Sequence, residues 1–139
     1  MEVNLKLNKK MGISGINDLG LETMFDTHIP EGGENLAPTP MEIMLESLGA
    51  CSMMDIAAII RKKRKQITNL EANIIAERAE QHPKVFTKVY VKYRLTSPDA
   101  EIKDLERAVE LSQTTYCSVS AMFQRSGCEV KWDCELING

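Results

Sequence analysis

The chain has 139 residues and a net charge of −3, from 17 basic and 20 acidic side chains. This length corresponds to one domain that is large enough to bury a hydrophobic core. The net negative charge argues against a protein whose main function is to bind nucleic acid. No run of 18 or more apolar residues is present, and residues 1–10 lack an apolar core of signal-peptide length. We therefore expect a cytoplasmic protein that has neither a membrane nor a nucleic acid as its partner.

The first 26 residues have the pattern of a small strand meander. Val3, Leu5 and Leu7 alternate with polar residues, which is the signature of a half-buried strand. Three glycines then divide the apolar pieces that follow, as tight turns do: Gly12, Gly15 and Gly20. Residues 27–39 contain two prolines and two glycines, so we expect a long loop that separates these strands from the rest of the chain.

A long helix is predicted to follow this loop. Thr39 is a good N-cap, Pro40 suits the first helical position, and Glu42 completes a capping box. From Met41 to Ile60 the helix is apolar on nearly every side, so we expect it to be buried almost all round. The basic residues 61–65 then complement the helix dipole, although a site for an anionic ligand or a nucleic acid is an alternative interpretation of them.

Two strands come next along the chain. Apolar residues occupy even positions in residues 70–78 and odd positions in residues 85–95, which predicts an antiparallel hairpin with its turn at residues 81–84. The same alternation places Val85 and Thr87 on one strand, and Arg78 on the other, on the apolar face of the hairpin.

Two helices and a final strand complete the predicted order. Ser97 or Asp99 is expected to cap the second helix, which breaks near Tyr116, and a short helix is expected over residues 118–125. Apolar residues alternate again over residues 128–136, as in a strand. The whole order predicts an α+β fold in which antiparallel sheet covers a long buried central helix.

Four cysteines are the candidate reactive residues. They form no Cys-x-x-Cys pair, and the chain has only two histidines, so we expect neither a zinc site nor another cofactor. Cys128 and Cys134 lie on the apolar face of the last strand, where small buried cysteines are normal. Cys51 lies in the middle of the long helix, in a column with Ser47 and Asp55 at a spacing of four residues.

Cys117 lies where one helix breaks and the next begins. A thiol at a helix N-terminus is favoured as the thiolate, so we expect a lowered pKa for Cys117. The residues alone leave a second interpretation open for both Cys51 and Cys117, which is that each is a buried structural cysteine.

The segments around these two cysteines carry a resemblance to a known family. Residues 40–52 have a proline at the helix start and a cysteine further along the helix, and residues 116–120 place a second cysteine at the opening of a later helix. In both features the chain resembles the OsmC/Ohr family, and residues 77–83 resemble its YhfA-like branch. The resemblance spans residues 36–137, and it implies one OsmC-like domain over residues 1–139, with N-terminal strands, a loop and a core from residue 40 to 137.

This resemblance implies a thiol-dependent peroxidase that reduces organic hydroperoxides in oxidative-stress defence. Cys51 would attack the peroxide, Cys117 would resolve the product as a disulfide, and an external dithiol would reduce the disulfide. This assignment of Cys51 as the attacking thiol disagrees with the helix argument, which gives the lower pKa to Cys117. The resemblance also implies an intertwined homodimer.

Two departures from the family pattern concern the residues around the reactive thiol. The better known members place a glutamate directly after the helix-start proline, where this chain has Met41, so Glu42 is the available acid. They also use an arginine from the N-terminal strands, whereas this chain has no arginine before Arg61, so Arg78 is the candidate substitute. A non-catalytic redox-responsive protein and a ligand-binding protein are the alternative functions.

Overall fold

The computed structural model covers residues 1–139, which divide into two compact units, Met1–Glu46 and Ser47–Gly139. The N-terminal unit contains the predicted meander, an antiparallel sheet made of β1 (Val3–Leu7), β2 (Ile13–Asn17) and β3 (Glu22–Phe25). The register pairs Leu5 with Gly15, and Gly15 with Thr23, so the odd-numbered residues of β1 share one face of the sheet. Within the single chain these side chains are not half-buried as expected, because each is more than 60% exposed: Val3, Leu5 and Leu7.

The loop between β3 and the long helix is fixed by one buried carboxylate. Asp26 accepts hydrogen bonds from three backbone N–H groups, those of Leu36, Thr27 and Glu34. These bonds favour the ionised form, so they lower the pKa of Asp26. Gly33 packs so tightly here that a Cβ atom would lie 1.9 Å from the Thr27 carbonyl oxygen. The predicted loop is therefore an ordered segment, with one turn of 3-10 helix at Ile29–Glu31.

Helix α1 spans Pro40–Lys62 and starts as predicted. The Thr39 hydroxyl accepts a hydrogen bond from the Glu42 N–H at 3.3 Å, and the Glu42 carboxylate accepts one from the Thr39 N–H at 3.1 Å. This capping box lowers the pKa of Glu42. Burial almost all round the helix is not seen within one chain, where the buried residues form a single stripe: Leu48, Gly49, Ser52, Ile56 and Ile60.

Helix α1 is also long and apolar enough to cross a membrane by length and composition alone, with a mean hydropathy of 1.7 over 18 residues. Core helices pass the same test, and this helix packs its buried stripe against protein. A Cβ atom at Gly49 would lie 2.9 Å from the Ile74 side chain, and Ser52 is hydrogen-bonded to Tyr93 on a neighbouring strand. These contacts join the buried stripe of α1 to two neighbouring strands, while 28% of the 18-residue segment is buried within the single chain.

The second unit is built on a three-stranded sheet in the order β4 (Asn69–Arg78), β5 (Phe86–Ser97) and β6 (Glu129–Asn138). Strands β4 and β5 form the predicted antiparallel hairpin. Strand β6 runs parallel to β5, which differs from the expected antiparallel pairing. A parallel pair needs a long crossover connection. Here the crossover contains α2 (Ile102–Leu111), a π-helical turn (Ser112–Tyr116) and α3 (Ser118–Arg125).

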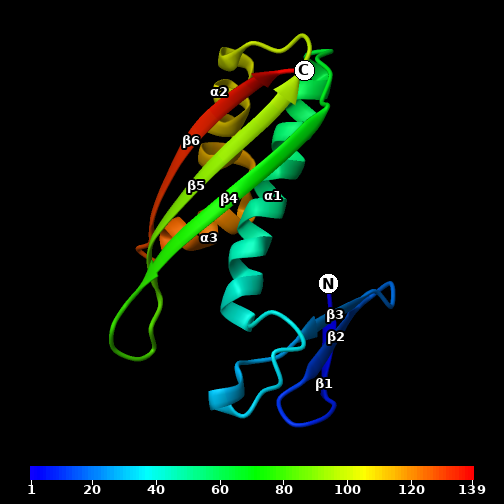
Figure 1. Ribbon diagram of the computed structural model, residues 1–139, viewed down its shortest axis with the longest axis vertical. Coiled ribbons are helices and arrows are strands. Elements are labelled where there is room, and N and C mark those ends of the chain that lie inside the picture. The colour runs from blue at the N-terminus through cyan, green and yellow to red at the C-terminus, as the bar shows by residue number, and fades with distance from the viewer. The chain divides into compact units, whose positions relative to one another are not determined.

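The helices of this unit lie on one face of its sheet (Figure 1). The face toward them carries the fully buried residues of β5, which are Val89, Val91, Tyr93 and Leu95. The opposite face is charged and exposed, and it holds ion pairs such as Arg94 with Glu135 at 3.0 Å. The α+β class expected from the sequence is confirmed.

Two local features differ from the sequence expectations. Helix α2 is capped by Glu101, whose N–H donates to the Asp104 carboxylate at 3.0 Å, rather than by Ser97 or Asp99. The β4–β5 register also shifts at a bulge between Glu77 and Arg78. As a result, on the far side of the bulge Phe86 is buried, while Val85 and Thr87 are exposed.

Candidate functional site

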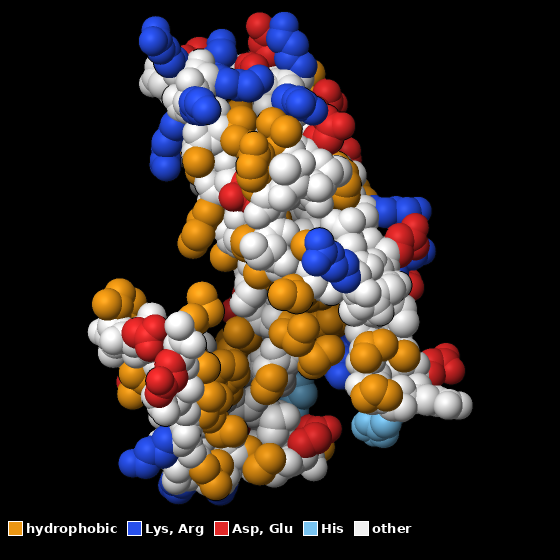
Figure 2. All heavy atoms as spheres, turned by 180° about the vertical axis from the view of Figure 1, so that it is seen from behind, with side chains coloured by type: hydrophobic (Ala, Val, Ile, Leu, Met, Phe, Trp, Pro, Cys, Tyr) orange, Lys and Arg blue, Asp and Glu red, His pale blue; other side chains and the backbone are white.

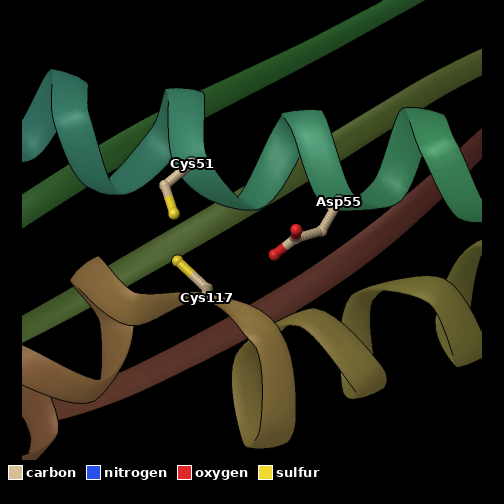
Figure 3. A group of neighbouring side chains, drawn as sticks. All are labelled: Cys51, Asp55 and Cys117. Atoms are coloured by element: carbon tan, nitrogen blue, oxygen red, sulfur yellow. The ribbon is translucent and has the colours of Figure 1, made fainter.

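Three side chains of the second unit meet in one cluster, which consists of Cys51, Asp55 and Cys117. Their sulfur atoms and a carboxylate oxygen all lie within 4.8 Å of one another. Figure 3 shows the two sulfur atoms pointing toward each other, with the Asp55 carboxylate beside them. Both thiols are free; Cys51 is half-buried, whereas Cys117 is only 4% exposed. Cys51 is therefore the more exposed of the two thiols.

Helix α1 places the first two of these side chains. Cys51 and Asp55 are four residues apart, so they lie on the same face of the helix. The Ser112 hydroxyl donates a hydrogen bond to Asp55 Oδ2 at 2.9 Å. Asp55 therefore connects α1 to the start of the π-helical turn that leads to Cys117.

The π-helical turn places Cys117. Its last hydrogen bond runs from the Cys117 N–H to the Ser112 carbonyl oxygen at 2.8 Å. Cys117 then takes an extended conformation and caps α3, and its Sγ accepts a hydrogen bond from the Ser120 N–H at 3.3 Å. Single π turns inside helical segments are frequent at functional sites. The sequence carried no signal for this turn beyond the expected break near Tyr116.

A buried polar network lies behind the cluster and joins the elements that carry it. The Tyr93 hydroxyl on β5 donates to Ser52 Oγ at 2.6 Å, next to Cys51 in the chain. The Gln113 amide donates to the Tyr93 hydroxyl and accepts from the Ser120 hydroxyl. No buried side-chain nitrogen or oxygen atom in the chain lacks a partner. A fully satisfied network of this kind fixes the position of its members, which here flank both cysteines.

The electrostatics of Cys117 differ from the sequence expectation. The pKa of the Cys117 thiol is raised to about 11, mainly by burial and to a smaller extent by the neighbouring Cys51 and the negative charge of Asp55. The hydrogen bond from the Ser120 N–H acts in the opposite direction, as a helix N-terminus should, but its effect is smaller. The expected lowered pKa is therefore wrong, because the energetic cost of burying a charge outweighs the helix N-terminus. Cys117 is a protonated thiol at neutral pH.

The two other candidate site residues have contacts of their own. Glu42 lies in the N-terminal unit, where it caps α1. Arg78 lies at the hairpin end of β4, where its Nε donates to the Lys84 carbonyl oxygen at 2.8 Å. Its guanidinium also stands 6.0 Å from the centroid of the Phe86 ring. These contacts hold Arg78 at the hairpin.

The remaining cysteines lie apart from the cluster. Cys128 is buried just before β6, and Cys134 is half-buried within that strand. Burial raises the pKa of both thiols, that of Cys134 to about 11. Both are packed thiols on or next to the last strand.

Comparison with known proteins places this arrangement in a family. Residues 32–133 match the family model of the OsmC-like proteins. The chain is also 31% identical over 115 residues to the protein YhfA of Escherichia coli K12, and the matched region covers 82% of this chain and 86% of YhfA. The chain belongs to the OsmC-like protein family, as its sequence features implied.

Solved structures agree with this assignment. A hypothetical protein from Aquifex aeolicus superimposes with a TM-score of 0.81 at 32% identity, covering 97% of this chain and 96% of that protein. An organic hydroperoxide resistance protein from Legionella pneumophila superimposes with a TM-score of 0.67 at 15% identity, covering 97% of both chains. The first is similar in sequence as well as structure, whereas the second shares the fold.

Proposed function

We propose that this protein reduces organic hydroperoxides with the Cys51 and Cys117 thiols, as a defence against oxidative stress in the cytoplasm. The observation that carries the proposal is the pair of free sulfur atoms that point toward each other within 4.8 Å. The fold supports it, because it is shared with an organic hydroperoxide resistance protein. Cys128 and Cys134 are not members of the cluster.

Cys51 carries the first step. Its sulfur attacks the distal oxygen of the hydroperoxide, so an S–O bond forms while the O–O bond breaks. The alkoxide leaves as an alcohol after it takes up a proton, and Cys51 is left as a sulfenic acid. The exposure of the two thiols supports this assignment, because Cys51 is half-buried and Cys117 is buried.

Cys117 carries the second step. Its sulfur attacks the sulfur of the sulfenic acid, so an S–S bond forms while the S–O bond breaks. The departing hydroxide leaves as water with the proton that Cys117 gives up. The raised pKa of Cys117 suits this order, because a protonated thiol does not compete with Cys51 for the peroxide. An external dithiol then reduces the disulfide by thiol–disulfide exchange and restores both thiols.

Apolar side chains near the pair support a preference for peroxides with an apolar organic group. Met54 follows Cys51 by three residues on α1 and is 73% exposed, and Tyr116 directly precedes Cys117 and is 60% exposed. An apolar group that buries surface against them gains about 25 cal/mol per Å². Hydrogen peroxide has no such group, so it should be the poorer substrate.

Glu42 and Arg78 enter the proposal as residues that assist the thiol pair. Both already serve the fold, Glu42 in the capping box and Arg78 at the Lys84 carbonyl. A functional role therefore predicts that Glu42→Gln and Arg78→Lys lose peroxidase activity while the chain stays folded.

We further propose that the active form is a homodimer. Each unit exposes apolar surface within the single chain, on β1 in the first unit and at Met54 of α1 in the second. Hydrophobic side chains are visible on the surface of the N-terminal strands in Figure 2. Permanent interfaces of this kind bury more than about 2,000 Å² in total. Sedimentation at micromolar protein should give the mass of two chains, and a monomer at that concentration would contradict the proposal.

The peroxidase proposal is tested by the consumption of an organic hydroperoxide under excess dithiol. Wild type should consume the peroxide over many turnovers, and Cys51→Ser should reduce the rate to that of the dithiol alone. Cys134→Ser is the matched control, because this thiol is half-buried like Cys51 but is not a member of the cluster. It should retain the wild-type rate.

Two results would contradict the peroxidase mechanism. Cys51→Ser could consume peroxide as fast as wild type, which would place the chemistry elsewhere. Alternatively, the wild type could form the Cys51–Cys117 disulfide without turnover, which would make the protein a redox-responsive switch.

A further inference from the structure

We propose that reduced Cys51 and Cys117, together with Asp55, bind one thiophilic divalent cation such as Zn²⁺. The cation site uses the same side chains as the proposed peroxidase, but it requires only the reduced thiols and no peroxide chemistry. The proposal rests on the grouping of two sulfur atoms and one carboxylate in a partly buried place. The lack of a Cys-x-x-Cys pair argued against zinc in the sequence, whereas the fold brings together residues that lie far apart in the chain.

The distances between the ligand atoms are close to those of a zinc site. Zn²⁺ binds thiolate sulfur at about 2.3 Å and carboxylate oxygen at about 2.0–2.2 Å, so two sulfurs on one tetrahedral ion are about 3.8 Å apart. The ligand atoms of the cluster lie within 4.8 Å of one another without an ion. The two sulfurs would therefore have to approach each other by at most about 1 Å to share one ion. Three protein ligands leave the fourth tetrahedral position open, as in zinc sites that also bind water or a small molecule.

Asp55 has no step in the proposed peroxidase reaction, and its hydrogen bond with Ser112 uses one of its two carboxylate oxygens. A carboxylate beside two thiols opposes the formation of thiolates. A bound divalent cation reverses this effect, because it stabilises both thiolates and accepts the carboxylate as a third ligand. The cluster has the donor set of a cation site with mixed sulfur and oxygen ligands.

Hydrogen bonds from outside the cluster orient two of the ligands. The Ser112 hydroxyl donates to Asp55 Oδ2 at 2.9 Å, which leaves the other carboxylate oxygen for the cation. The Ser120 N–H donates to Cys117 Sγ at 3.3 Å, as an N–H group does to a metal-bound thiolate. Outer-shell bonds of this kind typically change metal affinity by about 10- to 100-fold when they are removed.

The cation and the disulfide exclude each other. A two-electron oxidant such as a hydroperoxide converts the two thiolates into a disulfide, whose neutral sulfurs are poor ligands for Zn²⁺, so the oxidised protein has lost both sulfur ligands. The cation would therefore protect the reduced thiols, and oxidation of the pair would release it.

The test is a titration of Zn²⁺ into the full-length, metal-free, fully reduced protein, in competition with a chromophoric chelator. We expect one Zn²⁺ per chain in the wild type and no binding at this site in Cys51→Ser or after oxidation to the disulfide. Asp55→Asn should lower the affinity by at least about tenfold, and Ser112→Ala by about 10- to 100-fold. Cys134→Ser should bind like the wild type. With Co²⁺ in place of Zn²⁺, the thiolate-to-cobalt charge-transfer band should weaken in Cys51→Ser.

The proposal is overturned if the reduced wild type binds no Zn²⁺, or if Cys51→Ser and Asp55→Asn bind it as tightly as the wild type. Loss of binding in Cys134→Ser would also overturn it, because the site would then lie elsewhere. Far-ultraviolet circular dichroism of each variant separates loss of a ligand from loss of the fold. Since no peroxide is present, the result is independent of the peroxidase test, and either proposal can fail while the other holds.

Discussion

Treatment of Cys117→Ser with an organic hydroperoxide should trap Cys51 as a sulfenic acid and abolish the intramolecular disulfide. The reason is that Cys117 is the one other thiol in the cluster with Cys51, so no second sulfur is available once it is replaced. Intact-mass measurement should show that the variant gains one oxygen atom, whereas the wild type loses two hydrogen atoms. A reagent specific for sulfenic acids should label the variant and not the wild type.

Cys128→Ser is the matched control for this prediction, because Cys128 is also a buried thiol with a raised pKa but lies outside the cluster. It should still form the disulfide and resist labelling. If Cys117→Ser instead formed an intramolecular disulfide through Cys128 or Cys134, the assignment of Cys117 as the resolving thiol would be wrong.

Tyr93→Phe should destabilise the protein by about 1–3 kcal/mol, which is the usual cost of leaving a buried polar group without its partner. Tyr93 is fully buried, and its hydroxyl accepts a hydrogen bond from the Gln113 amide and donates one to Ser52. Phenylalanine preserves the ring and its packing, so the loss reports on these hydrogen bonds. Urea unfolding measures the free energy of unfolding. The protein concentration must be the same in every experiment, because the stability of a dimer depends on it.

Tyr90→Phe provides the comparison for this effect. Tyr90 lies on the same strand but on the opposite face of the sheet, where it is 38% exposed. Its hydroxyl is free to bond with water, so its loss should cost less than about 0.5 kcal/mol. Equal effects of the two substitutions would contradict the view that the buried network stabilises the site.

Tyr93→Phe should also slow the formation of the Cys51–Cys117 disulfide, because Gln113 lies in the turn that precedes Cys117.

The features of this fold that the sequence predicted well are local ones. The start of α1 depends on the side chains of Thr39 and Glu42 and the backbone next to them, and the structure has the predicted capping box. The bounds of α3 at Ser118–Arg125 also agree with the prediction. Both depend on interactions within a few residues, for which the sequence pattern is sufficient.

The direction of β6 could not be predicted in the same way. Parallel and antiparallel strands alternate their side chains with the same period, so the pattern over residues 128–136 indicates a strand without its direction. The connection over residues 98–128 is long enough to cross the sheet, and this length is compatible with the parallel pairing that the structure shows. Strand direction depends on contacts between distant parts of the chain. The alternation of side chains does not contain this information, so the expected antiparallel pairing of β6 was wrong.

In the candidate site, too, the sequence predicted the local arrangement but not the contacts between distant residues. The spacing of Cys51 and Asp55 predicts that they share a helix face, because four residues make about one turn. The proximity of Cys117 to them came only from the resemblance to a family, since nothing in the sequence relates two residues on different helices. The direction of the Cys117 pKa shift was wrong because it depends on burial by the rest of the fold.

The π-helical turn at Ser112–Tyr116 has a consequence for the comparison of related chains. A π turn holds one residue more than an α turn, and each residue of a helix advances the chain by about 100°. A relative with an ordinary α turn at this place would therefore be one residue shorter before its cysteine. A comparison without a gap would pair Cys117 with the residue after that cysteine, and the relative would wrongly be counted as lacking the second thiol.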